Sequence, residues 1–387
     1  MTGWQLLAIL FFARMAMAFQ FQSVAALAPF LIESHGVGFG DIGLLIGLYL
    51  APGLVAAYLG GTIGRRFGER RVVLVGMLIM VLGAGLALLP GAGWQMQLAA
   101  RLLAGIGGVL LNILMTKMVV DAFSGGRLAT AMGIFLNSWP VGIAAALLLL
   151  PMVAASGGLA AAHWIVASVV VVGLLLFALG TKPDPSAQEP SASGPTPRLR
   201  GAPLQGALAA GTIWAAYNGA LAMVFGFGAA LLAENRWDAV AAGQMTSVSL
   251  WLVAVSIPIG GVLADWSGRR DLVLAAGLSA FAALFLAAPT GLPFVFLFIA
   301  FGLVGGLSAG PIMSLPADVL PPSLRAEGMG VFFTIFYLGT MGAPLVAGWL
   351  IEVTGSAASA FYFGAFLLAL CAPAMLITKR LARQAPA

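Results

Sequence analysis

The chain has 387 residues, of which 61% are hydrophobic and only 8% are charged, and its formal net charge is +5. A water-soluble protein needs about a quarter charged residues to cover its surface, so this composition excludes a soluble enzyme and makes lipid the main solvent. The single cysteine, Cys371, excludes an intramolecular disulfide. The positive charge does not indicate nucleic-acid binding, which needs Lys and Arg clustered beside base-stacking aromatic residues.

Twelve apolar runs, each long enough for a helix to cross a bilayer, follow one another along the chain. A crossing helix needs about 20 residues, because each residue adds about 1.5 Å across a hydrocarbon core of about 30 Å. The runs are too long for barrel strands, and the first is too long for a cleaved signal peptide. They cover residues 5–32, 41–63, 71–90, 94–120, 127–153, 160–180, 203–232, 240–264, 271–289, 292–319, 324–352 and 357–379.

The basic residues predict which side of the membrane each loop faces. With both termini in the cytoplasm, fourteen of the eighteen Lys and Arg residues lie on cytoplasmic segments, and only Arg236 lies outside. This asymmetry follows the positive-inside rule and accounts for the basic composition. We therefore expect an integral protein of the bacterial inner membrane with cytoplasmic termini. Three basic residues, Arg14, Arg101 and Lys117, lie within the apolar runs.

The order of the runs predicts two similar halves. A stretch rich in Pro, Ser and Ala separates six runs from the other six, and it is typical of a flexible linker. We expect an N-terminal six-helix bundle over residues 1–180, a cytoplasmic linker over 181–202 and a C-terminal six-helix bundle over 203–387. A repeat supports this division, because the sequence from Gly61 to Arg71 after the second run is similar to that from Gly261 to Arg270 after the eighth.

These repeated loops resemble the signature of the major facilitator superfamily of secondary transporters. The family pattern G-x-L-A-D-R-x-G-R-R/K matches residues 261–270 nearly throughout, whereas Arg65 stands where the first copy should have Asp. Arg101 with Gly105 resembles the family's motif in the fourth helix. The resemblance covers the whole chain and implies an all-α membrane protein with twelve transmembrane helices in two pseudo-symmetric bundles. It also implies possible membership of the cyanate and nitroimidazole branch or of a monocarboxylate-like anion branch.

The signature loops supply the candidates for gating. Gly68 and Gly268 are expected to form the tight turn after a helix. Asp265, at a cytoplasmic helix end, is placed to meet a helix N-terminus or an Arg of the other half, near Arg127, and so to latch one conformation. Solvated membrane-surface roles are the alternative for the loop arginines. The coupling and gating candidates are Arg101, Arg127, Asp265, Arg269, Gly61, Gly68, Gly261 and Gly268.

Arg14 is the strongest candidate for contact with the substrate. An ionisable side chain inside a membrane-spanning helix costs about 2.5–3.5 kcal/mol or more at the centre, so it indicates function. Phe21 and Gln22 follow on the same or the adjoining surface of the helix, which predicts one shared wall of a central cavity. The alternative is a structural Arg that donates to backbone carbonyls. The other substrate-binding candidates are Asn112, Asn137, Tyr217, Asn218, Trp251 and Tyr337.

Arg101 has two open interpretations, and Lys117 mainly one. The family resemblance implies that Arg101 couples protons or shapes the cavity, while a hydrogen-bond link between helices is equally compatible with the sequence. Lys117 and Asp121 are one helical turn apart, which favours a structural pair. No Asp or Glu falls at mid-membrane, so Arg14 and Arg101 should give the cavity a positive field that favours anions. If protons are coupled, Glu33, Asp41 or the substrate itself carries them.

The sequence thus predicts a monomeric secondary transporter that moves a small, carboxylate-like anion by alternating access, with proton coupling as an option. An efflux pump for amphipathic drugs is the closest alternative, and a non-transporting receptor or scaffold is the alternative from another class. An enzyme is not expected, nor are a cofactor, a metal site or a nucleic-acid partner. His35 and His163 are far apart in the sequence, and the chain contains no P-loop.

Overall fold

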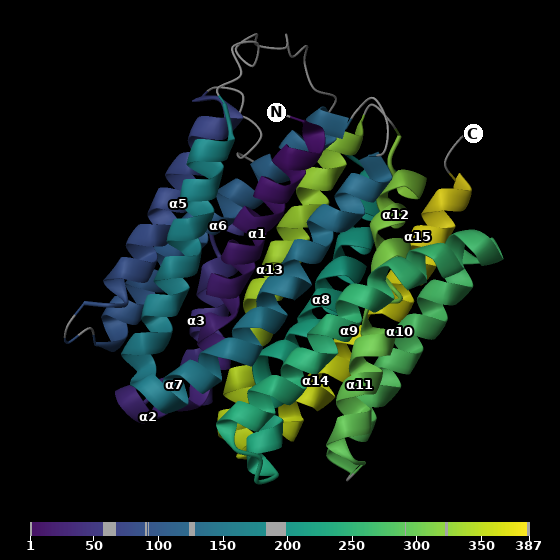
Figure 1. Ribbon diagram of the computed structural model, residues 1–387. Helices are drawn as coiled ribbons and strands as arrows, with labels where there is room; N and C mark the ends of the chain where they lie inside the picture. Colours follow the sequence, from purple (N-terminus) through teal and green to yellow (C-terminus); the bar gives the residue numbers. More distant parts are fainter. Residues whose placement is uncertain are drawn as a thin grey trace.

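The structure, a computed structural model, describes residues 2–56, 67–89, 91, 93–123, 128–182, 199–290, 292–321 and 324–384. These residues form helices and no strands, as the sequence predicts (Figure 1). Most of the predicted linker lies outside the described residues. The helices are α1 (Gly3–Ala26), α2 (Ala28–His35), α3 (Phe39–Leu50), α5 (Glu69–Leu86), α6 (Trp94–Phe123), α7 (Leu128–Gly180), α8 (Ala202–Glu234), α9 (Ala239–Ser267), α10 (Arg270–Ala287), α11 (Phe294–Gly305), α12 (Ala309–Val319), α13 (Arg325–Thr354), α14 (Ala358–Ala369) and α15 (Cys371–Gln384), with a short 3₁₀ turn at Ala288–Thr290.

The described helices account for the twelve predicted crossings. Ten helical segments are long and apolar enough to span a membrane. One of them, Ala131–Gly180, has 50 residues and turns back at Gly158, whose φ of 78° and ψ of 172° are not helical, so it makes two passes. The remaining pass is α5, an 18-residue helix with three charged residues, Glu69, Arg70 and Arg71, in its first turn. The prediction of an all-α membrane protein is confirmed.

Among the described residues, the first, tenth and last predicted runs are each divided into two helices, and in each case a proline follows the break. The first run is interrupted at Leu27, two residues before Pro29, and the tenth run is interrupted just before Pro311. The last run is interrupted at Leu370, three residues before Pro373. Proline lacks an N–H group and its ring crowds the preceding turn, so it marks where a helix kinks or restarts.

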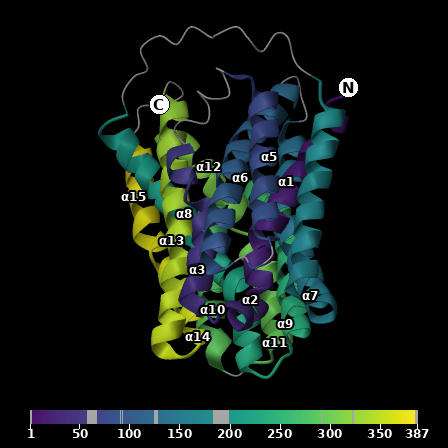
Figure 2. The ribbon, with the colours of Figure 1, turned by 90° about the vertical axis from the view of Figure 1, so that its left-hand side faces the viewer.

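Both chain termini lie at one end of the bundle, which we call the termini end, and α2 and α14 lie at the opposite end, which we call the far end (Figures 1 and 2). Among the helices before the linker, α1 packs along α7 and α5 along α6. Among those after it, α8 packs against α13, α14 and α15, while α9 packs against α11. We call residues 1–180 the first half and residues 203–387 the second half.

Candidate functional site

Arg14 lies near the middle of α1 and is held by four other residues of the first half. It is eleven residues into the helix, or about 17 Å from its start. Its Nε donates to Oδ1 of Asn112 at 2.8 Å, and its Nη1 donates to Oγ of Ser138 at 3.2 Å. Nη1 also lies 3.2 Å and 3.0 Å from the carbonyl oxygens of Phe135 and Leu136. The carbonyl contacts agree with the interpretation of Arg14 as a structural residue. They are also compatible with substrate contact.

The charge of Arg14 is not neutralised by a carboxylate among the described residues. None of the ion pairs found there includes it, and the titratable side chain that acts on it electrostatically is Tyr337, from the second half. Among the described residues Nη2 donates no hydrogen bond, and Arg14 as a whole is 9% exposed. The guanidinium carbon lies 4.9 Å from the centre of the Phe135 ring and 5.6 Å from that of Trp139. The groups found around this cation are thus neutral.

Arg101 is arranged differently, because all three of its guanidinium nitrogens bond to backbone. Nε donates to the carbonyl of Leu45 at 2.8 Å, Nη1 to that of Gln20 at 2.8 Å, and Nη2 to that of Phe21. The guanidinium also stacks on Tyr49, with 4.5 Å from its carbon to the ring centre. Arg101 therefore ties α6 to α1 and α3, which is the hydrogen-bond role that the sequence left open.

A small polar cavity inside the first half lies beside Arg101. The volume of this cavity is about 50 Å³, enough for a few water molecules. Gln20, Gln97, His163 and Arg101 are among the residues that line it. Oε1 of Gln20 is buried without a partner, and a water molecule in this cavity is the simplest donor for it.

Phe21 and Gln22 lie between the halves, farther toward the far end than Arg14. Gln22 is 1% exposed, and its Nε2 donates to the carbonyl of Phe225 on α8 at 2.7 Å. The Phe21 ring lies 5.2 Å from the Trp139 ring and 6.1 Å from the Phe225 ring. These contacts seal α1 against α8 on the far side of Arg14.

The remaining predicted substrate residues are divided by the structure. Tyr337, on α13 of the second half, lies close enough to Asn112 and Arg14 to interact with both electrostatically, so it belongs with Arg14. Asn137 is half-buried, and its Oδ1 lacks a partner among the described residues. Tyr217 is fully buried and donates to the carbonyl of Gly305 at 2.6 Å, which makes it part of the second-half core. The last two stand apart from the contacts of Arg14: Asn218 donates to the carbonyl of Trp214 at 2.8 Å, and Trp251 is 41% exposed.

The two halves meet closely at the far end, along α3 and α13. A side chain at Gly43 or Gly47 of α3 would overlap with the carbonyl oxygens of Pro344 and Met341 of α13. At the outermost position, Oε1 of Glu352 accepts a hydrogen bond of 2.8 Å from the backbone N–H of Gly40. A second contact joins α7 to α9, where Ser247 donates to the carbonyl of Ala144 at 2.8 Å. At the termini end, no comparable packing joins α6 or the start of α7 to α12 or α13 among the described residues. The structure is therefore closed at the far end.

Glu352→Gln is expected to weaken this closure. The carboxylate of Glu352 lies at the N-terminus of α3, where a negative charge stabilises a helix by about 0.3–1 kcal/mol. Removing the charge should raise the open-to-closed ratio of the far end about two- to fivefold. Distances between spin labels at Ser34→Cys and Thr354→Cys, in a Cys371→Ala background, measure the ratio. Arg236→Gln removes one charge from an exposed site at the same end and should have no effect; equal shifts in both variants would contradict the assignment.

The signature loops keep some of their predicted geometry. Gly68 and Gly268 have φ of 81° and 60°, so both adopt the left-handed backbone that favours glycine, while Gly261 lies inside α9 with open space around it. Asp265 is exposed and forms no ion pair among the described residues. Gly61 and Arg127 lie outside the described residues, so the predicted latch between Asp265 and Arg127 stays a prediction.

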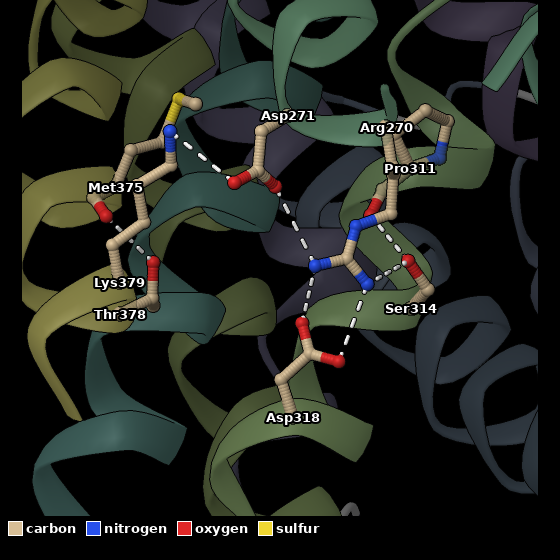
Figure 3. Close-up of polar contacts among 8 residues, drawn as sticks. All are labelled: Arg270, Asp271, Pro311, Ser314, Asp318, Met375, Thr378 and Lys379. Atoms are coloured by element: carbon tan, nitrogen blue, oxygen red, sulfur yellow. Dashed lines mark hydrogen bonds and ion pairs between the residues drawn. The ribbon is translucent and has the colours of Figure 1, made fainter. Parts of the chain in front are cut away.

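Arg270, rather than Arg269, forms the contacts of this loop (Figure 3). It pairs with Asp318 at the end of α12 and, at 3.5 Å, with Asp271; Lys379 of α15 pairs with Asp271 at 3.2 Å. These four residues border a cavity with a volume of about 270 Å³. The network ties α10, α12 and α15 together at the termini end. This network was not predicted from the sequence, because it joins positions that are distant along the chain.

Arg270→Met should lower the unfolding free energy by about 1 kcal/mol, because it leaves Asp318 and Asp271 without their shared cation. The small size follows from the exposure of the Arg270 side chain, which is about a third accessible. Thermal unfolding of the purified protein measures the change. Arg269→Met, which removes an exposed cation outside the network, is the matched control and should leave the midpoint in place.

Comparison with known proteins points to one family over the whole chain. The sequence profile of the Major Facilitator Superfamily matches residues 10–234 and again residues 206–386. An uncharacterized MFS-type transporter of Bacillus subtilis, YfkF, is 27% identical over 84% of this chain and 82% of its own length. Bovine monocarboxylate transporter 13 is 28% identical over 80% of this chain and 74% of its own. The probable sulfoacetate transporter SauU of Cupriavidus necator is 26% identical over 92% and 88%.

Shorter matches and solved structures complete the comparison. The multi-drug resistance efflux pump PmrA of Streptococcus pneumoniae is 29% identical over 33% of this chain and 32% of its own. The crystal structure of the nucleoside transporter NupG has a TM-score of 0.75 at 15% identity, covering 96% of this chain and 99% of its own. A bacterial homolog of the lysosomal transporter Spinster, titled as inward-facing and occupied, has a TM-score of 0.69 at 16% identity and covers 97% and 96%.

Proposed function

The chain belongs to the Major Facilitator Superfamily, and on that premise we propose that it is a secondary transporter which moves a small organic anion across the bacterial inner membrane. The observation that carries the choice of an anion is Arg14. Its guanidinium lies at mid-helix, is not paired with a carboxylate among the described residues, and has one nitrogen, Nη2, without a hydrogen bond among them. Guanidinium binds carboxylates and similar oxyanions through parallel hydrogen bonds.

Two relatives add support from their names alone. Monocarboxylate transporter 13 and the probable sulfoacetate transporter SauU are both named for anionic substrates, and both align over most of this chain. A basic residue inside the membrane is costly unless it performs a task that a neutral side chain cannot. Binding an anion offsets this free-energy cost during transport, because the ligand supplies the missing counter-charge.

The proposed mechanism is alternating access between the two halves. By the positive-inside rule the termini end faces the cytoplasm, so the closed far end makes this an inward-facing state. In the opposite state the proposed pair of Asp265 and Arg127 closes the cytoplasmic end. The anion neutralises Arg14 when it binds, which favours the change between the two states. If protons accompany the anion, Glu33 and Asp41 at the far end are the proposed carriers.

Arg14→Gln is expected to abolish binding and uptake of the anion while leaving folded protein in the membrane. Glutamine keeps polar atoms near Asn112 and Ser138 but removes the positive charge. Uptake of a panel of small radiolabelled anions into proteoliposomes, at imposed pH and voltage gradients, measures the effect. Uptake by the variant at the wild-type rate would refute the role of Arg14, and no uptake of any anion by the wild type would refute the proposed function.

Efflux of amphipathic drugs is the second candidate. It is favoured by the aromatic side chains of the second half, where Trp214 of α8 stacks on Phe336 of α13 with 6.1 Å between ring centres. The match to PmrA over a third of the chain is also in its favour. The same proteoliposomes decide between the candidates: transport of a neutral or cationic dye that Arg14→Gln leaves unchanged would favour drug efflux.

A further inference from the structure

We propose that the site takes a ligand with a single negative charge and a compact apolar body, and that it rejects dianions of the same size. This inference rests on the proposed function, because it concerns the ligand of the same site, and it sets this chain apart from SauU, since sulfoacetate carries two negative charges. It starts from a count of the cations that a ligand beside Arg14 can reach. The sequence predicts two such cations, Arg14 and Arg101, and among the residues that the structure describes one remains.

Arg101 is unavailable to a ligand at Arg14 for reasons of position and of bonding. Its Nη1 and Nη2 donate to the carbonyls of Gln20 and Phe21, which lie six and seven residues after Arg14 on α1. That spacing places it about 10 Å farther toward the far end. It is 5% exposed, and the Phe21 ring covers it with 5.4 Å between guanidinium carbon and ring centre. The Phe21 ring in turn contacts Trp139.

Lys117, the third basic residue inside the predicted runs, is occupied elsewhere. It is half exposed on α6 and pairs with Glu69 and, at 2.9 Å, with Asp121. It lies five residues after Asn112 along the helix, or about 8 Å nearer the termini end. Its charge is balanced by two carboxylates, so it offers little attraction to a second anionic group on a ligand.

The surroundings of Arg14 are neutral. Asn112 and Ser138 accept its hydrogen bonds, Tyr337 contributes a hydroxyl, and Phe135 and Trp139 contribute rings. A ligand's single carboxylate can meet Nη2, and the rings favour an apolar remainder. A second carboxylate would leave water without meeting a cation, and a buried charge without a partner is strongly unfavourable. We expect a dianion to bind at least tenfold more weakly than the monoanion that matches it in size.

The test compares pairs of ligands that differ by one carboxylate. Butyrate and succinate both contain four carbons, and benzoate and phthalate share one ring. Binding to the purified full-length protein is measured at pH 7.5, where every carboxylate is ionised, by ligand-induced thermal stabilisation and by competition in proteoliposome uptake. Arg14→Gln is the charge-loss variant. Arg14→Lys, which keeps one charge without the fork geometry, shows that the site remains folded if it retains weak binding of the monoanion.

Each outcome bears on the proposal. Binding of butyrate or benzoate that exceeds binding of succinate or phthalate at least tenfold, and that Arg14→Gln abolishes, supports a site with one charge. Equal or tighter binding of the dianions, also lost in Arg14→Gln, would overturn the single-charge inference and leave the anion transporter standing. Binding of none of the anions, or binding that Arg14→Gln does not change, would overturn both.

Discussion

Asn112→Asp should strongly weaken anion uptake while leaving Arg14 in place. The new carboxylate would stand where Oδ1 of Asn112 now accepts from Nε of Arg14 at 2.8 Å, so the protein itself would neutralise the guanidinium. A charge-assisted pair contributes about 1.5–3 kcal/mol, and the ligand would have to compete with it. We expect affinity for the anion to fall about 10- to 100-fold, measured by uptake and by ligand-induced thermal stabilisation.

This variant separates charge from shape, because aspartate and asparagine have nearly the same size. Asn235→Asp makes the same chemical change at the exposed end of α8 and is the matched control. The control should transport at the wild-type rate. If Asn112→Asp also transported the anion normally, the unpaired charge of Arg14 would not be what binds the substrate.

Gly47→Val is expected to arrest the protein with its far end open. A side chain at Gly47 would overlap with the backbone carbonyl of Met341 on α13, and a backbone group gives way less readily than a flexible side chain. Because this contact joins the halves, the strain is relieved when α3 and α13 separate rather than when either half unfolds. Overpacking of this kind costs about 1–3 kcal/mol, enough to shift the open-to-closed ratio about 5- to 150-fold.

The spin-label pair at Ser34→Cys and Thr354→Cys reports this opening as a longer distance. Gly342→Val is the matched control, since a side chain at Gly342 on α13 meets nothing within 4 Å. Gly107→Val should behave differently from both, because Gly107 lies against the carbonyl of Gly76 within the first half, and the change should lower thermal stability. An unchanged label distance in folded Gly47→Val would show that the α3–α13 contact does not govern closure.

Much of the fold follows from the sequence, because the membrane restricts what a chain can do. Backbone groups in lipid must bond within their own segment, so long apolar runs have to be helices. The exact ends of the helices were less predictable where proline interrupts a run: Leu27 and Leu370 divide segments that composition alone treats as continuous. The tight turns at Gly68 and Gly268 were predictable, since only glycine adopts their φ without strain.

The site was predictable in its central residue and not in its partners. Arg14 stands out from the sequence because a lone cation in an apolar run is costly. Nothing in the local pattern shows that Asn112 and Ser138 hold it or that Tyr337 comes to it from the other half. Glu352 and the Arg270 network were missed for the same reason. Their partners, at Gly40 and Asp318, lie 312 and 48 residues away along the chain.

By itself the sequence determined that this protein crosses a membrane as helices, repeats a loop signature in its two halves and carries uncompensated positive charge within its spans. These properties depend on composition, run length and spacing, which are local. Only the tertiary structure decided that Arg101 is bound to the carbonyls of Leu45, Gln20 and Phe21, while Nη2 of Arg14 has no hydrogen bond among the described residues. The difference is physical: a charge is costly in lipid wherever it lies, but which groups satisfy it depends on the neighbours that packing brings near.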